Sequence, residues 1–362
     1  MTQRERQILR WIEENPMISQ QELADRAGIT RSSVAVHISN LMKKGYILGK
    51  GYVVHTAPYA VVVGGVNLDI GGWSQDPLIP RDSNPGRVRM SLGGVGRNIA
   101  HNLCLLGADV RLLTAFGDDM SAQKLAASCG ELGIDISQAL QVPGAATSTY
   151  LFLAGPDGDM ALAVNDMDIY RHVTPAYLAA RSALLDNAQL ILVDTNIPEE
   201  SIAWLSANAK VPIFADPVST TKAAKLKRSL GRLHNLKPNR MEAELLSGVP
   251  ITDEDSLHRC ADALLNTGLR RVFISLGGDG IFAADHNGRC QLPCLPGKMV
   301  NTTGCGDAAM AAVAWAYLQG TDLEGTAQAA LAAGAIAMES AETINPAMSE
   351  KALKQRMAEK PV

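Results

Sequence analysis

A short run of small residues followed by a carboxylate is the strongest chemical signal in this chain of 362 residues. Gly304, Cys305 and Gly306 precede Asp307, and an alanine-rich segment, residues 308–318, follows. Small residues allow a tight turn into a helix, where unpaired N–H groups and the positive end of the helix dipole converge on one point. The amides could bind a phosphate there while Asp307 accepts the proton of a hydroxyl group. The pattern favours phosphoryl transfer to an alcohol, and an aspartate that merely caps a helix is the alternative.

Two further pairs of polar residues lie where a binding site would need them. Residues 59–63 form a continuous apolar run that ends in glycines, which is typical of a buried strand leading into a site. Asn67 and Asp69 follow this strand and are candidate substrate ligands, although both residue types also form turns. Asn239 and Glu242 are three residues apart in an early helical turn, so an amide and a carboxylate face the same way. They suit a Mg²⁺–phosphate held through water, and a capped helix is the alternative.

The elements that must position these residues alternate along the chain. After residue 188, apolar strands alternate with helical segments, which predicts an α/β domain with a doubly wound, mainly parallel sheet. Asn196 lies at the carboxyl end of one such strand, where ligands bind in this class of sheet. Another buried strand, residues 272–276, ends in a glycine turn at residues 277–280. We therefore expect ligands to converge on one edge of the sheet.

A small β-lid over the substrate is predicted from about residues 71–91 and 147–165. The second segment consists of two alternating strands joined by Gly-Pro-Asp-Gly, so we expect a hairpin. The first segment is expected to be a loop and an outlying strand. Asn165 and Asp166 close the hairpin at the mouth of the site and are further candidate substrate ligands, with a turn as the alternative.

Residues 1–56 form a separate amino-terminal module. Apolar periodicity and caps predict three helices that end near Asn15, at Gly28 and near Lys44, with the spacing of a helix-turn-helix. Alternation across residues 45–54 predicts a short hairpin, which would be a wing.

The outer face of the third predicted helix carries side chains able to contact bases and phosphates: Arg31, Ser32, Ser33, His37, Asn40 and Lys43. Residues 1–56 contain eight Lys/Arg and five Asp/Glu, a formal charge of +3, whereas the remainder of the chain carries −7. The module resembles the winged helix-turn-helix domains of bacterial regulators, and we expect it to bind DNA. A three-helix docking or dimerisation domain is the alternative.

The larger part of the chain, about residues 59–345, resembles the ribokinase (PfkB) family of carbohydrate and nucleoside kinases. Four motifs occur in the order and spacing of that family: Asn67 with Asp69, Gly93–Gly94 with Asn98, Asn239–x–x–Glu242, and the run from Thr302 to Asp307. The resemblance implies a ribokinase-like fold for residues 57–362, with Asp307 as the catalytic base and the amides of residues 304–306 around the phosphoryl group.

The resemblance also assigns the remaining site residues. The acceptor would contact Asn67, Asp69, Gly93, Gly94 and Asn98, and the candidates named above from their positions, Asn165, Asp166 and Asn196, are added to this set. ATP would lie along Ser275, Leu276, Gly277, Gly278, Asp279 and Gly280, with Asn239 beside it and Glu242 ordering the water around Mg²⁺. Asn301 stands where the family usually has Asp, so a monovalent cation such as K⁺ near Asn301 and Thr303 is left open.

Within the family, four strings are most similar to those of pseudouridine kinases, at residues 93–100, 165–167, 236–240 and 277–280. The resemblance therefore implies a nucleoside acceptor. Two alternatives stay open: a kinase of a free sugar such as a pentose, and a ligand-sensing transcriptional regulator that uses a kinase fold.

Composition sets the class of protein. A hydrophobic content of 47% with 19% charged residues indicates a soluble, well-buried globular protein. No apolar run reaches membrane length, and Arg4, Glu5, Arg6 and Arg10 interrupt any signal-peptide core. We expect a cytoplasmic homodimer with no membrane partner and with its six cysteines reduced.

Overall fold

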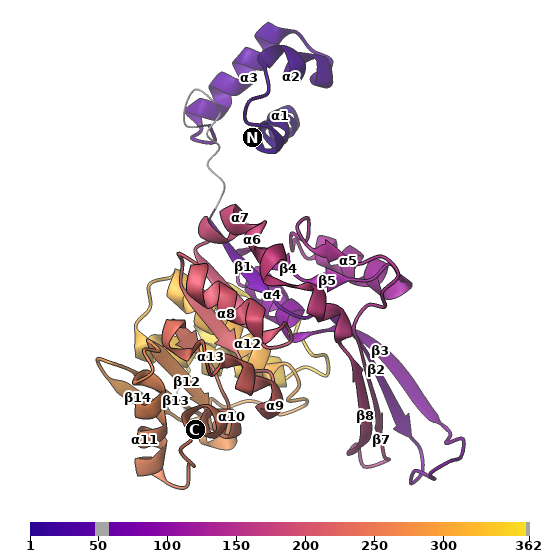
Figure 1. The fold of residues 1–362 in the computed structure, drawn as a ribbon, viewed down its shortest axis with the longest axis vertical. Coiled ribbons are helices and arrows are strands. Elements are labelled where there is room, and N and C mark those ends of the chain that lie inside the picture. The colour runs from indigo at the N-terminus through magenta and orange to yellow at the C-terminus, as the bar shows by residue number, and fades with distance from the viewer. Residues whose placement is uncertain (48–57, 360–362) are drawn as a thin grey trace. The chain divides into compact units, whose positions relative to one another are not determined.

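The computed structural model describes residues 1–47 and 58–359, and the chain divides into two compact units, Met1–Pro58 and Tyr59–Val362. Figure 1 shows both units as ribbons.

The amino-terminal unit is a bundle of three helices, α1 (Gln3–Glu14), α2 (Gln20–Ala27) and α3 (Arg31–Lys43). Thr2 and Ser19 open the first two helices with capping boxes, and Thr30 caps the third. The core combines aliphatic side chains from all three helices: Ile8, Leu9, Ile12, Leu23, Val34, Ile38 and Leu41, with Ile18 and Ile47 from the flanking segments. The predicted helix-turn-helix is confirmed, whereas most of the predicted wing lies outside the described residues.

The carboxy-terminal unit is built on an eight-stranded sheet in the order β14-β13-β12-β11-β10-β9-β1-β4. Its strands are β1 (Tyr59–Val63), β4 (Asp109–Leu113), β9 (Leu190–Asp194), β10 (Ile213–Asp216), β11 (Asn235–Leu236), β12 (Arg271–Ser275), β13 (Ile281–Asp285) and β14 (Arg289–Leu292). Neighbouring strands from β4 to β12 are parallel, and β13 and β14 continue the sheet antiparallel. The predicted mainly parallel, ribokinase-like sheet is confirmed. A short parallel pair, β5 (Ala115–Phe116) and β6 (Leu140–Gln141), lies apart from it.

Helices cover both faces of this sheet because alternate residues of each central strand point to opposite sides. In β1, Val61 and Val63 join one buried cluster while Ala60 and Val62 join the other. Helices of the first cluster are α6 (Pro175–Ala179), α7 (Ser182–Asp186), α8 (Glu199–Asn208), α10 (Arg240–Ser247) and α11 (Glu254–Leu265), with the short α9 (Thr220–Ala223) beside them. Those of the second are α4 (Val95–Leu105), α5 (Met120–Glu131), α12 (Cys305–Leu318), α13 (Leu323–Met338) and α14 (Glu350–Met357).

A separate four-stranded sheet forms the lid, in the order β3-β2-β7-β8. Its strands are β2 (Asn67–Ser74), β3 (Gly86–Gly93), β7 (Thr149–Ala154) and β8 (Met160–Asp166), and Figure 1 shows them extending away from the large sheet. Sequence reasoning was wrong about residues 71–74, which continue strand β2 rather than form a loop. The glycines Gly71 and Gly72 obscured the strand pattern there, although β2 pairs along its whole length with β3.

Candidate active site

The start of α12 presents its backbone amides to a cavity. Gly304 precedes the helix with a φ of 86°, and no side chain caps the first turn. A Cβ at this position would collide with the carbonyl oxygen of Thr343, so glycine is required both by the positive φ and by the close approach. The uncapped N–H groups and the helix dipole favour an anion at this point.

Asp307, in the first turn of α12, is joined to α4 by a hydrogen bond. Asn98 Nδ2 donates to Asp307 Oδ2 at 2.8 Å. The other amide atom, Asn98 Oδ1, is buried and has no partner among the described residues. An unpartnered buried acceptor next to a carboxylate suits a ligand that brings a hydroxyl group.

The environment of Asp307 makes its carboxyl a weak acid. The side chain borders the cavity, yet surrounding protein atoms remove enough water that burial raises its pKa to about 8. The carboxylate of Asp216 raises this pKa further, while the Asn98 hydrogen bond and the Lys237 ammonium lower it. A carboxyl with a pKa near neutrality suits a general base.

Asn67 and Asp69 begin lid strand β2 and are hydrogen-bonded to each other through Asn67 Nδ2 and Asp69 Oδ1. Asn67 is buried, and burial raises the pKa of Asp69 to about 6. A Cβ on Gly93 would collide with the Asp69 carboxylate, and one on Gly94, where φ is 98°, would meet the backbone of Val66. These two glycines therefore let α4 and its Asn98 approach the pair closely.

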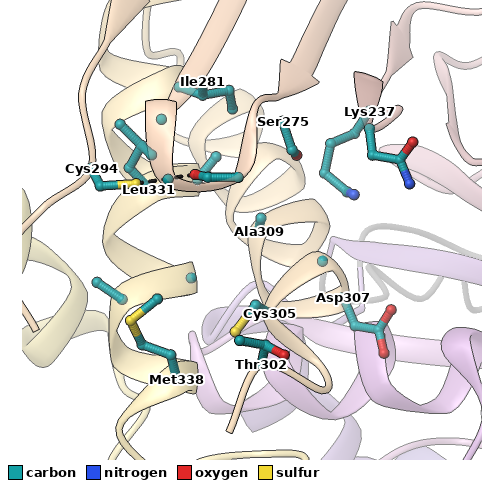
Figure 2. Close-up of a pocket in the computed structure, with 18 of the residues that line it drawn as sticks. Lys237, Ser275, Ile281, Cys294, Thr302, Cys305, Asp307, Ala309, Leu331 and Met338 are labelled. Atoms are coloured by element: carbon teal, nitrogen blue, oxygen red, sulfur yellow. Dashed lines mark hydrogen bonds between the residues drawn. The ribbon is translucent and has the colours of Figure 1, made fainter. Parts of the chain in front are cut away.

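The cavity next to Asp307 has a volume of about 500 Å³ and differs in character along its length. Figure 2 shows Asp307 and Lys237 at one end, and Leu331 and Met338 of α13 at the other. Ser275, Gly277, Gly278 and Gly280 line the wall between β12 and β13. A charged end next to an apolar end is suited to a ligand with a phosphate chain and a flat, apolar ring.

Asn239 and Glu242 also line this cavity, and they form the capping box of α10. The Asn239 side chain accepts from the Glu242 N–H at 2.9 Å, and the Glu242 carboxylate accepts from the Asn239 N–H at 2.8 Å. Burial raises the pKa of Glu242. The helix-cap alternative and a role in binding are thus both compatible with the same geometry.

Sequence reasoning missed a buried ion pair at the charged end. Lys237 Nζ lies 3.2 Å from Asp216 Oδ2, and both side chains are almost fully buried. A Cβ built on Gly306 would lie 3.5 Å from Lys237 Nζ, so the ammonium borders the first turn of α12. The signal was available, because Lys237 directly follows the buried strand β11 and Asp216 ends β10.

A second missed residue, Asp194, holds the carboxyl end of the sheet together. Its carboxylate accepts the backbone N–H groups of Gly65 and Gly96, each at 2.8 Å, and that of Asn196 at 2.8 Å. The contact joins the end of β9 to the turn after β1 and to the start of α4. A strand-ending Asp before Thr195 gave no sequence signal for this long-range role.

The other predicted residues lie around the cavity or apart from it. Neither Leu276 nor Asp279 lines the cavity. Leu276 is buried, and the Asp279 carboxylate lies 3.5 Å from the Arg240 guanidinium. Asn196 does not line the cavity either, and its Oδ1 accepts from Lys222 Nζ at 2.6 Å. Asn301 Oδ1 accepts from the Thr303 N–H at 3.0 Å in the loop before α12.

Asn165 and Asp166, at the end of β8, are exposed and lie on opposite faces of the lid. Asn165 pairs with Tyr150 and shares the face of Asp69, whereas Asp166 pairs with Thr149 on the other face. The placement of Asp166 is therefore unfavourable for substrate contact, contrary to the expectation from sequence.

In the amino-terminal unit, Arg31, Ser32, Ser33 and Lys43 are exposed on α3. His37 differs from expectation because it is only partly exposed, and its Nδ1 is buried without a partner among the described residues. The Ser33 hydroxyl lies 2.9 Å from that of Thr30, so it also takes part in the helix start.

Comparison with known proteins agrees with this geometry. Residues 57–351 match the pfkB family carbohydrate kinase profile, and residues 1–47 match a winged helix-turn-helix DNA-binding profile. Pseudouridine kinase of Escherichia coli (strain K12) is 39% identical over 293 residues, covering 80% of this chain and 94% of that protein. The uncharacterized sugar kinase YeiI of the same organism is 38% identical over 351 residues, covering 96% of this chain and 97% of that protein.

A solved structure shows the same fold. Arabidopsis thaliana ribokinase, complexed with ribose and ATP, superposes with a TM-score of 0.75 at 21% identity, covering 84% of this chain and all 100% of that one. The chain belongs to the pfkB family of carbohydrate kinases, with a winged helix-turn-helix domain at its amino terminus. It is a phosphotransferase with an alcohol group as acceptor, of the sugar or nucleoside kinase type. No helix of residues 1–47 or 58–359 is long and apolar enough to cross a membrane.

Proposed function

We propose that this protein transfers the γ-phosphoryl group of ATP to the hydroxymethyl group of a nucleoside, pseudouridine or a close relative. The observation that carries the proposal is the hydrogen bond between Asn98 and Asp307 at the uncapped start of α12. It brings an acceptor-binding amide, a basic carboxylate and an anion-binding helix start to one point.

The chemical step uses these groups in order. Asn67, Asp69 and Asn98 would hold the hydroxyls of the sugar ring. Asp307 accepts the proton of the attacking hydroxyl, whose oxygen forms a bond to the γ-phosphorus while the bond to the leaving ADP oxygen breaks. Amides of residues 304–306 and the Lys237 ammonium offset the negative charge on the transferring group.

The cavity supports ATP as the phosphoryl donor. Its phosphates would lie towards Lys237 and the start of α12, and its base towards Leu331 and Met338. Among the described residues, no group of three or more His, Cys, Asp or Glu side chains could hold a metal ion by itself. Mg²⁺ in kinases takes one or two protein ligands and otherwise water and phosphate, so Glu242 with Asn239 fits it, and when bound it would neutralise phosphate charge.

Support for a nucleoside acceptor comes from the relative named pseudouridine kinase and from the strings shared with that group of enzymes. A free pentose is the second candidate, supported by the relative named as a sugar kinase. The test is a turnover assay with ATP against pseudouridine, uridine, inosine, cytidine and ribose. Preferred phosphorylation of pseudouridine supports the proposal, and preferred phosphorylation of ribose contradicts it. Ligand binding without any turnover would favour a sensing regulator instead.

We also propose that residues 1–56 bind DNA through α3. The exposed Arg31, Ser32 and Lys43 and the charge of +3 on this segment support phosphate and base contacts. His37, being partly buried, would position the helix surface more than contact bases.

We propose two further properties, a cation site and a dimer interface. A monovalent cation such as K⁺ would bind near Asn301 and Thr303, and a comparison of turnover in KCl and in choline chloride tests this.

The chain would form a homodimer through the aliphatic face of the lid, on the side away from Asp69. Its exposed side chains are Val88, Met90, Leu151, Leu153, Leu162 and Val164. The same face of a second copy offers a matching apolar surface, as expected for a symmetric dimer.

A further inference from the structure

The face of the lid that carries Asp69 also carries every aromatic residue of the four lid strands. Asp69 pairs with Tyr150 across β2 and β7, and Gly71 pairs with Phe152. Residues directly opposite each other on neighbouring strands point to the same face, and so do residues two apart on one strand. Trp73 therefore lies on this face as well. Only 4% of the residues in this chain are aromatic, yet three aromatic residues lie on one face of this small sheet.

These three rings form a continuous cluster next to Asp69. The Trp73 and Phe152 ring centroids are 5.2 Å apart with their planes at 89°, and the Tyr150 and Phe152 centroids are 6.0 Å apart. A Cβ on Gly71 would collide with the Trp73 and Phe152 rings, so both rings lie over that glycine. The rings remain partly exposed.

The cluster lies at a suitable distance from the sugar site. Gly71 follows Asp69 by two residues, which is about 7 Å along a strand. A ribose held by Asp69 is smaller than this distance, and the base attached to it extends beyond the sugar, so the base would reach the aromatic cluster. The opposite face of the lid is aliphatic. The surface proposed for the dimer and the surface proposed for the acceptor therefore lie on different faces of the lid.

We propose that Trp73, Tyr150 and Phe152 form the subsite on which the planar base of the acceptor nucleoside stacks. This inference rests on the proposed nucleoside acceptor. Arg87 and Arg89 of β3 pair with Trp73 and Gly71 and so lie on the same face. Their guanidinium groups only donate hydrogen bonds, so the subsite favours bases whose edges carry carbonyl oxygens.

The test compares Phe152→Leu with Ile79→Ala, a control at an exposed side chain in the loop between β2 and β3. For pseudouridine, Phe152→Leu is expected to raise KM about tenfold to a hundredfold and to change kcat less than threefold, because stacking holds the base and not the reacting hydroxyl. Ile79→Ala should leave KM within twofold. An unchanged KM in Phe152→Leu overturns the proposal. An equal rise in the KM for ribose also overturns the proposal, since the Phe152 ring would then support the structure of the lid without contacting the base.

A binding measurement separates this proposal from the proposed function. Pseudouridine should quench the fluorescence of Trp73, seen as a signal that the Trp73→Phe variant lacks, whereas ribose should not. Quenching without phosphorylation of any nucleoside would refute the proposed function and leave the stacking subsite standing. Phosphorylation of pseudouridine without quenching would refute the subsite alone.

Discussion

At the scale of the residue, the proposed role of Asp307 as general base makes the rate depend on whether its carboxyl carries a proton. Its pKa of about 8 means that the free enzyme holds a largely protonated carboxyl at neutral pH. A general base must be deprotonated to accept a proton, so kcat/KM should rise with pH and level off above about 8. A pH profile at low acceptor concentration checks this, and a profile that is flat from pH 6 to 9 would contradict it.

Replacing Asp307 by Asn should separate catalysis from stability. Loss of the base should lower kcat by roughly 10²–10⁴-fold while the acceptor still binds. The folded-state pKa is raised above the usual 3.8, so the native state binds more protons between pH 3.8 and about 8 and wild-type stability falls as pH rises through that window. Asp307→Asn should therefore melt above wild type at pH 9 and close to it at pH 4. A lower melting temperature for the variant at pH 9 would show that the carboxylate is not destabilising there.

Lys237 should matter for both charge and stability. In Lys237→Met, Asp216 is left buried without its partner, which should cost about 3–5 kcal/mol in the free energy of unfolding. The double variant Lys237→Met with Asp216→Asn removes both charges and should recover most of that stability, measured by denaturant unfolding. The double variant should nevertheless lack activity, because it has no ammonium group beside residues 304–306. A double variant as active as wild type would exclude Lys237 from the chemical step.

Residues with a local pattern were predictable, and residues with a long-range role were not. Gly304, Gly306 and Asp307 stand together in the sequence, so the helix start could be located from the order of residues alone. The ion pair of Lys237 and Asp216 joins residues that are 21 positions apart, and Asp194 binds amides about 100 or more positions away. Such contacts depend on which strands become neighbours, and apolar patterning alone does not specify that order.

At the scale of the element, the lid is a sheet with two different faces. The hairpin of β7 and β8 was predictable from alternation, whereas glycines in β2 concealed a strand that lies at the centre of the lid. Those same glycines are explained by their neighbours, since Gly71 lies beneath the aromatic rings. The lid thus places Asp69 and the aromatic rings on one face and leaves aliphatic residues on the other.

The aliphatic face gives a direct test of dimer formation. Leu162 is 61% exposed on that face, in the edge strand β8, and Leu162→Glu would bury a charge in a symmetric contact through this face. Light scattering coupled to size exclusion should show a dimer for wild type and a monomer for the variant. Glu in place of the exposed Met241, on α10, serves as a control that should remain dimeric. A monomeric wild-type protein would refute the dimer.

At the scale of the whole molecule, the chain joins an acidic kinase domain to a basic helical module. If α3 contacts DNA phosphates, Arg31→Ala and Lys43→Ala should each weaken binding. Each should also reduce the slope of log affinity against log salt concentration by about one, because one fewer counterion is released. Fluorescence anisotropy with labelled DNA at several salt concentrations measures both effects. Lys354→Ala, in the exposed ion pair of α14, is a control in the other unit. Affinity that ignores salt would contradict a DNA-binding role.

Burial of Asp307, which keeps most of its carboxyl protonated at neutral pH, also affects the enzyme without its acceptor. A water molecule in the acceptor's place lies next to a carboxyl that is mostly protonated. Such a carboxyl accepts the proton of the water poorly, so the water is poorly activated for attack on ATP. We therefore expect ATP to survive long residence in the cavity, with little futile hydrolysis in the absence of the second substrate.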